Sequence, residues 1–348
     1  TMSINYASWI NGLVVDVSRY QRKIRPGILR ANRIRMVIAK IGQGTSIDSR
    51  FPQHYGDCQQ EGMPISAYYW PDPIMNAKPQ AEWLLRTVDS YPGVLSIFED
   101  FEQWWAAWGP WLEAMQKKLA WAAVTRLSPN RISDVYLELA EFVQARTDKP
   151  QVSYTSQNFV KSYAPNMAGW LSRWPLWNAA YIWGGSRVTA TWDELKTDWF
   201  PRPGATPLIP PGAGRIVGWQ YTGDKLMLPG MYSDDAGTEL SPADVSVFDP
   251  DWLDRLTAPQ PAPQPEPLPE PQPEPEPTPA GVLQGTVIGT PYINIRSGPG
   301  TRYSDIGDLP AGTQVTAQAI DGQDVWIEIA PGRWACARTG ARKLIELT

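Results

Sequence analysis

Eight short runs of apolar residues recur along the chain, and each is rich in Val, Ile, Leu or aromatic side chains, as buried strands are. The runs are residues 13–18, 36–41, 64–70, 94–102, 151–155, 176–182, 215–222 and 243–248. Helical stretches between the earlier runs are predicted over residues 52–60, 76–90 and 110–147. Helices that alternate with strands form parallel βα units, so the pattern predicts an α/β barrel and not a β-sandwich.

Acidic residues stand at the ends of several predicted strands. The run 94–102 closes with an Asp-Phe-Glu sequence. Because successive side chains of a strand alternate faces, Asp100 and Glu102 point to one side and Glu99 to the other. Asp16 lies near the end of the first run, and Asp244 lies at the start of the last. An isolated pair of this kind is more often a solvated turn, but four acids on short apolar strands favour a site at the carboxyl ends of a barrel.

Two carboxyl groups aimed into one cleft suit the hydrolysis of a glycosidic bond, where one acid stays protonated and the other ionised. Glu102 is the candidate proton donor, because its aromatic sequence neighbours provide an apolar setting that raises a carboxyl pKa. Asp100 and Asp16 are expected to stay ionised. Asp100 would stabilise positive charge on the sugar or orient a nucleophile, and Asp244 would complete the acidic floor by hydrogen bonding.

Composition excludes several other chemistries. The net charge of the 348 residues is −5, which disfavours nucleic acid as a partner. His54 is the only histidine, so no multi-histidine zinc site and no Ser-His-Asp set with a spare histidine can be assembled. We interpret His54 as structural and expect no metal and no cofactor. Cys58 and Cys336 fall in different halves of the chain, which argues against a disulfide framework.

Targeting signals are not visible in the sequence. No run of 18 or more apolar residues occurs, so we expect no membrane span and no membrane partner. The first residues lack a basic segment followed by an apolar one, so we expect synthesis in the cytoplasm without a signal peptide.

A change of composition divides the chain. Residues 258–280 are dominated by Pro interleaved with Glu and Gln, which excludes helix and central strand and predicts a stiff polyproline-II linker. The linker separates a region of residues 1–257 from a small all-β region of residues 281–348, whose short strands and turns suit a small barrel.

Aromatic residues are abundant, with 18 Trp in the chain. Their flat faces pack protein cores and also stack on sugar rings. Residues 103–111, which follow the carboxylates directly, are either a cleft wall or a packed cap. The candidates for substrate contact lie near strand ends, although a place in the barrel core is the alternative for the aromatic ones. They are Tyr68, Tyr69, Trp70, Tyr154, Tyr181, Trp219, Tyr221 and Gln43.

Residues 11–256 resemble glycoside hydrolase family 25, the Chalaropsis-type lysozymes, through eight short motifs in the same order. The motifs are D-V-S at 16–18, A-K-x-x-x-G-T at 39–45, A-Y-Y-W at 67–70, D-F-E at 100–102, S-Y-T-S at 153–156, L-W-N-A-A-Y at 176–181, W-Q-Y-T at 219–222 and D-V-S-V-F at 244–248. The resemblance implies an irregular eight-stranded (β/α) TIM-like barrel with fewer than eight helices. It also implies cleavage of the β-1,4 bond between N-acetylmuramic acid and N-acetylglucosamine in bacterial peptidoglycan.

Two positions depart from that family's pattern. Gln43 stands where members usually carry Glu, and Tyr69 stands where they usually carry His. Neither is an expected acid, so these departures bear on substrate contacts or the pH optimum more than on the reaction.

Residues 281–348 resemble a bacterial SH3-like domain, through I-N-I-R-S-G-P-G-T at 293–301 and I-G-x-L-x-x-G-T at 306–313. In wall-lytic enzymes such modules hold the enzyme on peptidoglycan, and a passive spacer domain is the alternative.

The sequence therefore predicts a monomeric, modular muramidase with peptidoglycan as its partner. It would act at the bacterial cell wall as a phage endolysin, or outside the cell as a secreted autolysin. Two other classes stay open, a non-catalytic wall-binding protein built on the same barrel and a chitinase-like glycosidase.

Overall fold

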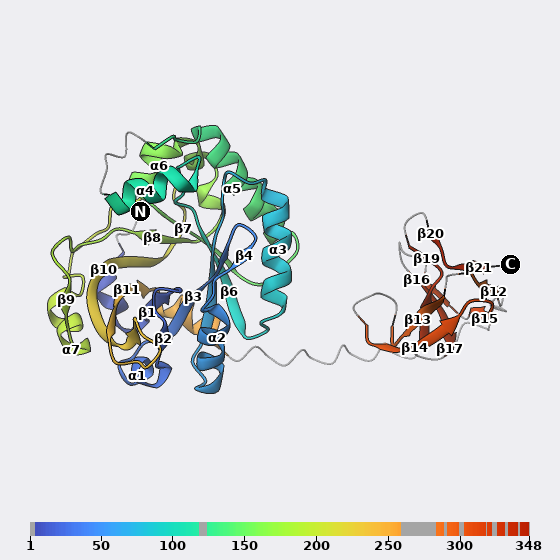
Figure 1. Cartoon of the computed structure of the whole chain (residues 1–348). Coiled ribbons are helices and arrows are strands. Elements are labelled where there is room, and N and C mark those ends of the chain that lie inside the picture. Colours follow the sequence, from blue (N-terminus) through green and yellow to red (C-terminus); the bar gives the residue numbers. More distant parts are fainter. Residues whose placement is uncertain are drawn as a thin grey trace, which may run out of the picture. The chain divides into compact units, whose positions relative to one another are not determined.

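A computed structural model of the chain describes residues 4–117, 124–258, 283–288, 291–298, 303–317, 319–321, 326–330, 333–339 and 342–347. The chain separates into two compact units, Thr1–Gln260 and Pro261–Thr348 (Figure 1). The predicted linker, residues 258–280, lies outside the described residues except for Ala258.

The first unit is built on eight strands that close on themselves, which confirms the predicted barrel. In chain order they are β1 (Leu13–Val17), β3 (Met36–Gln43), β5 (Ile65–Trp70), β6 (Val94–Asp100), β7 (Gln151–Ser156), β8 (Leu176–Ala179), β10 (Ile216–Tyr232) and β11 (Leu240–Phe248). β1 pairs with β3 on one side and with β11 on the other, which closes the sheet. β11 runs antiparallel to both of its neighbours, whereas the other pairings around the barrel are parallel.

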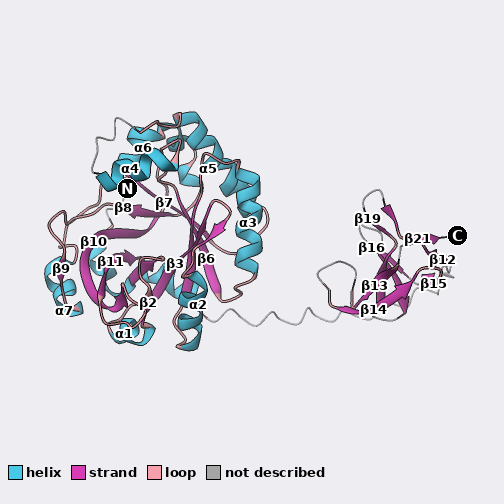
Figure 2. Ribbon diagram, viewed as in Figure 1, coloured by secondary structure: helices cyan, strands magenta, loops and turns pink. Residues whose placement is uncertain are grey.

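Helices cover the outside of this barrel, and Figure 2 shows the strands of the first unit gathered among them. The helices are α1 (Pro26–Ala31), α2 (Phe51–Gln60), α3 (Ala77–Asp89), α4 (Trp108–Lys117), α5 (Pro129–Gln144), α6 (Gln157–Tyr163), α7 (Trp192–Glu194) and α8 (Pro250–Thr257). The expectation of fewer than eight helices is therefore wrong by count in the described residues. The irregularity lies in their distribution, since α4 and α5 both follow β6 whereas β10 and β11 form a hairpin.

The remaining elements of the first unit are short. They are the strands β2 (Lys23–Ile24), β4 (Ser46–Ile47) and β9 (Val188–Thr189), the 3-10 helices η1 (Tyr6–Gly12), η3 (Pro165–Gly169) and η4 (Leu171–Arg173), and the π-helix η5 (Leu195–Trp199). The helix predicted over residues 110–147 is two helices, because α5 has its own start, where the Ser128 hydroxyl accepts a hydrogen bond from the Arg131 N–H and Pro129 occupies the first turn.

Alternation of side chains along the strands produces two apolar layers. The barrel interior is filled by Val14, Ile38, Phe98, Val152, Trp177 and Phe248. Side chains on the opposite faces, such as Val15, Ala39 and Ile97, pack in a separate layer together with helix residues. The side chains on one face of each strand therefore point into the barrel, and those on the other face are covered by the helices.

A β-bulge in β10 changes which residues face inward. The register with β8 shifts between Ile216 and Gly218, so that Gly218 lies opposite Trp177. A Cβ on Gly218 would lie 2.5 Å from the Phe248 ring, which explains why only glycine fits there. After the bulge, Trp219 packs in the outer layer and Gln220 turns inward.

The second unit is all-β in its described residues, as predicted. A three-stranded sheet contains β12 (Leu283–Val287), β15 (Gln314–Ala317) and β21 (Ile345–Leu347). A five-stranded sheet contains β13 (Tyr292–Arg296), β14 (Asp305–Pro310), β16 (Ala319–Asp321), β17 (Trp326–Ala330) and β18 (Arg333–Cys336), and β19 (Arg338–Thr339) pairs with β20 (Arg342–Lys343). Its core includes Val287, Ile293, Val315, Ile327 and Ile345. The resemblance to SH3-like domains stays a prediction.

Candidate active site

The four predicted acids gather at one end of the barrel. Asp100 is the last residue of β6, and Glu102 follows it by two positions. Asp16 lies directly opposite Asp244 in the pairing of β1 with β11. Because β11 runs antiparallel to β1, Asp244 in the middle of β11 lies beside Asp16 near the carboxyl end of β1. Asp16 and Asp100 are only 7% and 5% exposed, while Glu102 and Asp244 are half-buried.

Burial dominates the electrostatics of this cluster. It raises the pKa of Asp16 well above its ordinary value, and repulsion from Asp244 adds to the effect. It raises the pKa of Asp100 in the same direction, with repulsion from Glu102 next in size. Burial also raises the pKa of Glu102 to about 7 and that of Asp244 to about 7. The expected proton donor is thus protonated near neutral pH. Asp16 and Asp100, however, hold protons more strongly than the sequence suggested.

Gln220 organises one side of the cluster. Its Nε2 donates a hydrogen bond to Asp16 Oδ2 at 2.8 Å. Its Oε1 accepts hydrogen bonds from the Tyr154 hydroxyl at 2.7 Å and from the Tyr181 hydroxyl at 3.0 Å. The two phenols fix the orientation of the amide, which then stabilises the Asp16 carboxylate and opposes the effect of its burial.

Asp244 is held by backbone and lies beside open space. The Asp224 N–H donates to Asp244 Oδ1 at 2.8 Å, which lowers the pKa of Asp244 against the effect of burial. Asp224 adopts a left-handed conformation with φ 61°, which brings its N–H to the carboxylate. A cavity of about 460 Å³ here is lined by Tyr181, Asp224, Asp244 and neighbouring residues of the loops after β8 and within β10.

A lysine completes the site. Lys40 of β3 lies opposite Tyr68 in the parallel pairing with β5, so both side chains share the inner face. Its Nζ donates to Gln43 Oε1 at 3.1 Å and lies 4.5 Å from the centre of the Trp70 ring. The ammonium lowers the pKa of both Asp100 and Glu102 against the larger effect of burial.

Five of the eight predicted substrate-contact residues thus lie around the acids. Tyr68 and Trp70 of β5, Tyr154 of β7 and Tyr181 after β8 face the inside, together with Gln43 at the end of β3.

The structure does not bring the other three predicted contacts to the site. Tyr69, Trp219 and Tyr221 are fully buried in the outer layer. The Tyr69 hydroxyl donates to the Gly44 carbonyl, and its ring packs near Trp83 of α3. The reason is alternation on β5 and the bulge on β10, which turn these side chains toward the helices.

The tryptophan-rich segment after Glu102 is a packed cap. Trp105 is 3% exposed and stacks on Trp111 with ring centroids 4.3 Å apart. Trp70 packs against Trp105, and its Nε1 donates to Gln103 Oε1 at 3.2 Å. The cap therefore supports one wall of the barrel mouth through Trp70.

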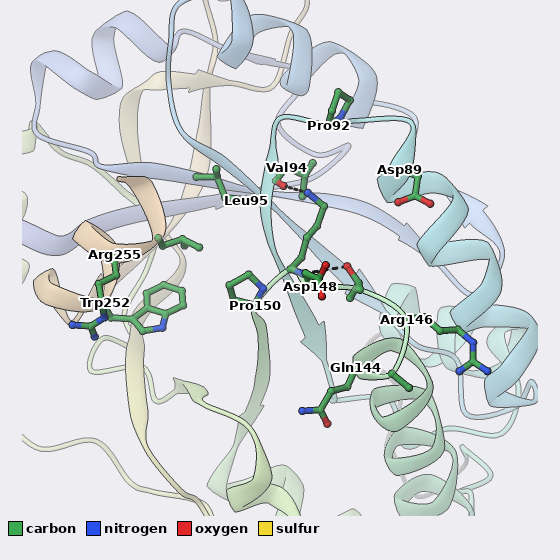
Figure 3. Close-up of a pocket in the computed structure, with 14 residues that line it drawn as sticks. Asp89, Pro92, Val94, Leu95, Gln144, Arg146, Asp148, Pro150, Trp252 and Arg255 are labelled. Atoms are coloured by element: carbon green, nitrogen blue, oxygen red, sulfur yellow. Dashed lines mark hydrogen bonds between the residues drawn. The ribbon is translucent and has the colours of Figure 1, made fainter. Parts of the chain in front are cut away.

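A larger cavity of about 770 Å³ lies at the opposite end of the barrel (Figure 3). It is lined by Val94 at the start of β6, by Pro150 before β7 and by Trp252 of α8. At about 3.3 Å per residue, the two ends of β6 lie roughly 20 Å apart. This cavity is therefore remote from the carboxylates.

Sequence reasoning missed two residues of the site, Lys40 and Gln220. Both belong to the family motifs given above. For Lys40 the available signal was its position two residues after Ile38, which places both side chains on the inner face of β3. His54 is structural as expected, since it is fully buried with Nε2 3.3 Å from the Ser18 carbonyl oxygen. The described residues contain no group of three or more His, Cys, Asp and Glu side chains arranged to hold a metal ion. Among the same residues, every helix is too short or too polar to cross a membrane.

The uncharacterized protein YegX of Escherichia coli O6:H1 is 27% identical over 177 residues, covering 48% of this chain and 55% of that protein. YegX of Escherichia coli K12 is 26% identical with the same coverage. The chain thus matches only about half the length of these curated relatives.

Two solved structures illustrate the structural comparison. The muramidase from Acremonium alcalophilum has a TM-score of 0.49 and 20% identity, over 70% of this chain and 97% of that chain. The lysozyme from Streptomyces coelicolor has a TM-score of 0.48 and 17% identity, over 70% and 95%. The family model described as "Glycosyl hydrolases family 25" matches residues 15–231, which is more than half of the chain. The chain belongs to glycosyl hydrolase family 25.

Proposed function

We propose that this protein hydrolyses the glycan strands of bacterial peptidoglycan at the β-1,4 bond between N-acetylmuramic acid and N-acetylglucosamine. The observation that carries the proposal is the pair of carboxyl groups at the end of β6. Asp100 and Glu102 share the inner face, and burial raises the pKa of Glu102 to about 7. A carboxyl group with that pKa is suited to donate a proton at neutral pH.

In the proposed reaction, Glu102 donates its proton to the glycosidic oxygen while the bond to the anomeric carbon breaks. Positive charge develops on that carbon, and Asp100 stabilises it directly or orients the substrate's own N-acetyl oxygen to attack. Water then completes hydrolysis, and Glu102 takes a proton from it. The Asp100 carboxylate must be ionised in this scheme, so its proton has to leave before the reaction.

The other site residues hold this arrangement and bind sugar. Asp16, fixed by Gln220, and Asp244, fixed by the Asp224 N–H, form the acidic floor. Tyr68, Trp70, Tyr154, Tyr181 and Gln43 are the proposed sugar contacts, since aromatic faces pack on sugar rings and hydroxyl and amide groups bond to sugar hydroxyls.

The test is a reducing-end assay on purified peptidoglycan, followed by mass analysis of the fragments. Soluble products with N-acetylmuramic acid at the new reducing ends support the proposal. Products that end in N-acetylglucosamine would assign the other bond. Equal or greater activity on chitin would favour a chitinase, and no new reducing ends on either polymer would favour a non-catalytic wall-binding protein.

For the second unit we propose a role in holding the enzyme on the wall, with the Pro-rich segment as linker. Tethering raises the local concentration of substrate without changing the chemistry. Ending the chain after Ala258 should therefore weaken lysis of whole cells most at low enzyme concentration, and should spare soluble glycan fragments. Unchanged lysis of whole cells by the shortened chain would make the second unit a spacer.

The wall is also the proposed place of action, as a monomeric phage endolysin released from the cytoplasm or as a secreted autolysin. Lysis after expression with and without a pore-forming partner distinguishes the two routes, because an endolysin without its own export signal needs the pore.

A further inference from the structure

Lys40 is a half-buried cation without an ionic partner in direct contact. The ion pairs within 4.0 Å formed by the described residues do not include it. Instead, its Nζ donates to the neutral amide of Gln43 at 3.1 Å and lies over the rings of Trp70, at 4.5 Å, and Tyr68, at 5.9 Å. These partners hold the ammonium in place without neutralising its charge.

The acids nearby repel one another, because four carboxyl groups lie at one end of the barrel. The groups that act on Asp100 are Glu102, Lys40 and Asp16. Those that act on Glu102 are Lys40 and Asp244, and Glu102 in turn acts on Asp16 and on the phenols of Tyr136, Tyr154 and Tyr181. Among these described groups, Lys40 is the one cation.

Charged groups on other elements also face Lys40. Asp48 and Arg19, which come before α2, act on it with opposite signs, and Asp100 exerts the largest attraction. Asp48 itself accepts hydrogen bonds from the backbone N–H groups of Arg19 and Arg50. The carboxylate that gains most from the Lys40 charge is thus Asp100, the residue that must be ionised during hydrolysis.

We propose that Lys40 is a positioning residue whose charge favours loss of the Asp100 proton beside a protonated Glu102, and that the neutral Gln43 preserves this function by binding the ammonium without neutralising it. The pair would set the pH range of hydrolysis. This inference rests on the proposed function, because it assigns Asp100 and Glu102 their roles in that reaction.

The kinetic test compares pH profiles of kcat/KM on soluble peptidoglycan fragments. An ammonium stabilises nearby carboxylates and lowers their pKa, so its removal raises the pKa of both Asp100 and Glu102. The acidic limb of the profile follows the group that must be ionised, and the alkaline limb follows the group that must be protonated. Lys40→Met should therefore move both limbs to higher pH, by on the order of 1 unit.

Gln43→Glu provides an independent variant that keeps Lys40. The new carboxylate pairs with the ammonium, so both limbs should move in the same direction as in Lys40→Met. Gln43→Met is the matched control for charge, since it removes the hydrogen bond and the proposed sugar contact without adding a carboxylate, and its limbs should move less than those of Gln43→Glu. If the wild-type enzyme is active and both limbs of Gln43→Glu and Lys40→Met stay at the wild-type pH, the inference is wrong.

A titration separates failure of this inference from failure of the proposed function. Carboxyl-carbon NMR of the protein labelled at Asp and Glu follows Asp100 and Glu102 without substrate, with Asp100→Asn and Glu102→Gln to assign the signals. Both pKa values should rise in Lys40→Met and in Gln43→Glu, even if no peptidoglycan is cleaved. Unchanged pKa values in both variants would contradict the role of Lys40 whatever the substrate.

Discussion

The two faces of β6 each bury a carboxylic acid with a carboxyl oxygen that lacks a hydrogen-bond partner, and the two acids differ in the charged groups around them. Asp100 faces the barrel interior, where Glu102, Asp16 and Lys40 act on it. Glu99 faces the helix side, is 0% exposed, and neither of its carboxyl oxygens has a hydrogen-bond partner. Its neighbours across the sheet are Tyr69 and Ser153.

Burial alone raises the pKa of Glu99 to about 8, so a shifted pKa does not distinguish a working acid from an idle one. The inner face is distinguished by the charged groups around its acids and by the exposure of those acids to solvent. The inner acids act on one another, on Lys40 and on Gln220, and Glu102 is partly exposed. Glu99 has none of these among the described residues, and the helix layer covers it. The comparison predicts that inner-face changes affect turnover and that outer-face changes affect stability.

The largest expected effect is that of Glu102→Gln, which removes the proposed proton donor. Turnover should fall by about 100-fold to 10,000-fold, the usual range for loss of general acid catalysis. Glu99→Gln, three residues away, is the matched control and should keep wild-type turnover. The measurement is initial rate on soluble peptidoglycan fragments, with circular dichroism to confirm folding. If the two variants behaved alike, the distinction between the faces would fail.

Glu99→Gln should instead change stability in a pH-dependent way. The pKa of Glu99 rises from an ordinary 4.5 to about 8 on folding, so the folded state binds more protons between these values. Stability is therefore lost as pH rises through that window, by up to about 1.4 kcal/mol per pH unit, and Gln removes the loss. We expect Glu99→Gln to be more stable than wild type by several kcal/mol at pH 9, up to about 5 kcal/mol from this slope and window, and nearly equal to it at pH 4.

Urea unfolding at the two pH values measures this difference. Equal stabilities at pH 9 would mean that the Glu99 carboxylate is solvated or paired when ionised. The comparison between the faces would then rest on access alone.

Much of this arrangement was predictable, because alternation and apolar runs are local properties. The eight runs each overlap one barrel strand, and the D-x-E spacing placed Asp100 and Glu102 on one face and Glu99 on the other. Asp244 was found as an acid near a strand start, although the antiparallel direction of β11 that brings it to Asp16 follows from the hairpin with β10.

The error at Trp219 and Tyr221 came where the register of β10 shifts, which local pattern does not show. The register of β10 shifts beside Gly218, where the Phe248 ring fills the space of a Cβ, and nothing within residues 215–222 reveals that ring. Because of this register shift, the Trp219 side chain points toward the helices and the Gln220 side chain points into the barrel. The long helix failed for a local reason, because the Ser128 cap and Pro129 inside the segment signal a new start.

The next effect in size concerns Gln220, whose amide links Asp16 to two phenols. Gln220→Leu removes the hydrogen bond to Asp16 Oδ2 and leaves the Tyr154 and Tyr181 hydroxyls without their shared acceptor. A hydrogen bond to a charged group contributes about 1.5–3 kcal/mol, so kcat/KM should fall about tenfold or more. The pKa of Asp16, followed by carboxyl-carbon NMR, should also rise, since the amide that lowers it is gone. A variant that kept both the rate and the Asp16 pKa would remove Asp16 from the working cluster.

The smallest expected effect compares two tyrosines that each lose only a hydroxyl group. Tyr154→Phe, on the inner face, removes one of two donors to Gln220 Oε1 and a proposed sugar contact. The loss of a neutral hydrogen bond is worth about 0.5–1.5 kcal/mol, so kcat/KM should fall about twofold to tenfold.

Tyr69→Phe, on the outer face, removes the bonds to the Gly44 carbonyl and Gln80 Oε1. It should lower the free energy of unfolding by about 1 kcal/mol and leave kcat/KM within about twofold of wild type. Urea unfolding and rates on soluble fragments measure the two quantities on the same preparations. A loss of rate in Tyr69→Phe equal to that in Tyr154→Phe would show that the outer layer also controls the geometry of the acids, and the separation of roles between the faces of the barrel would not hold.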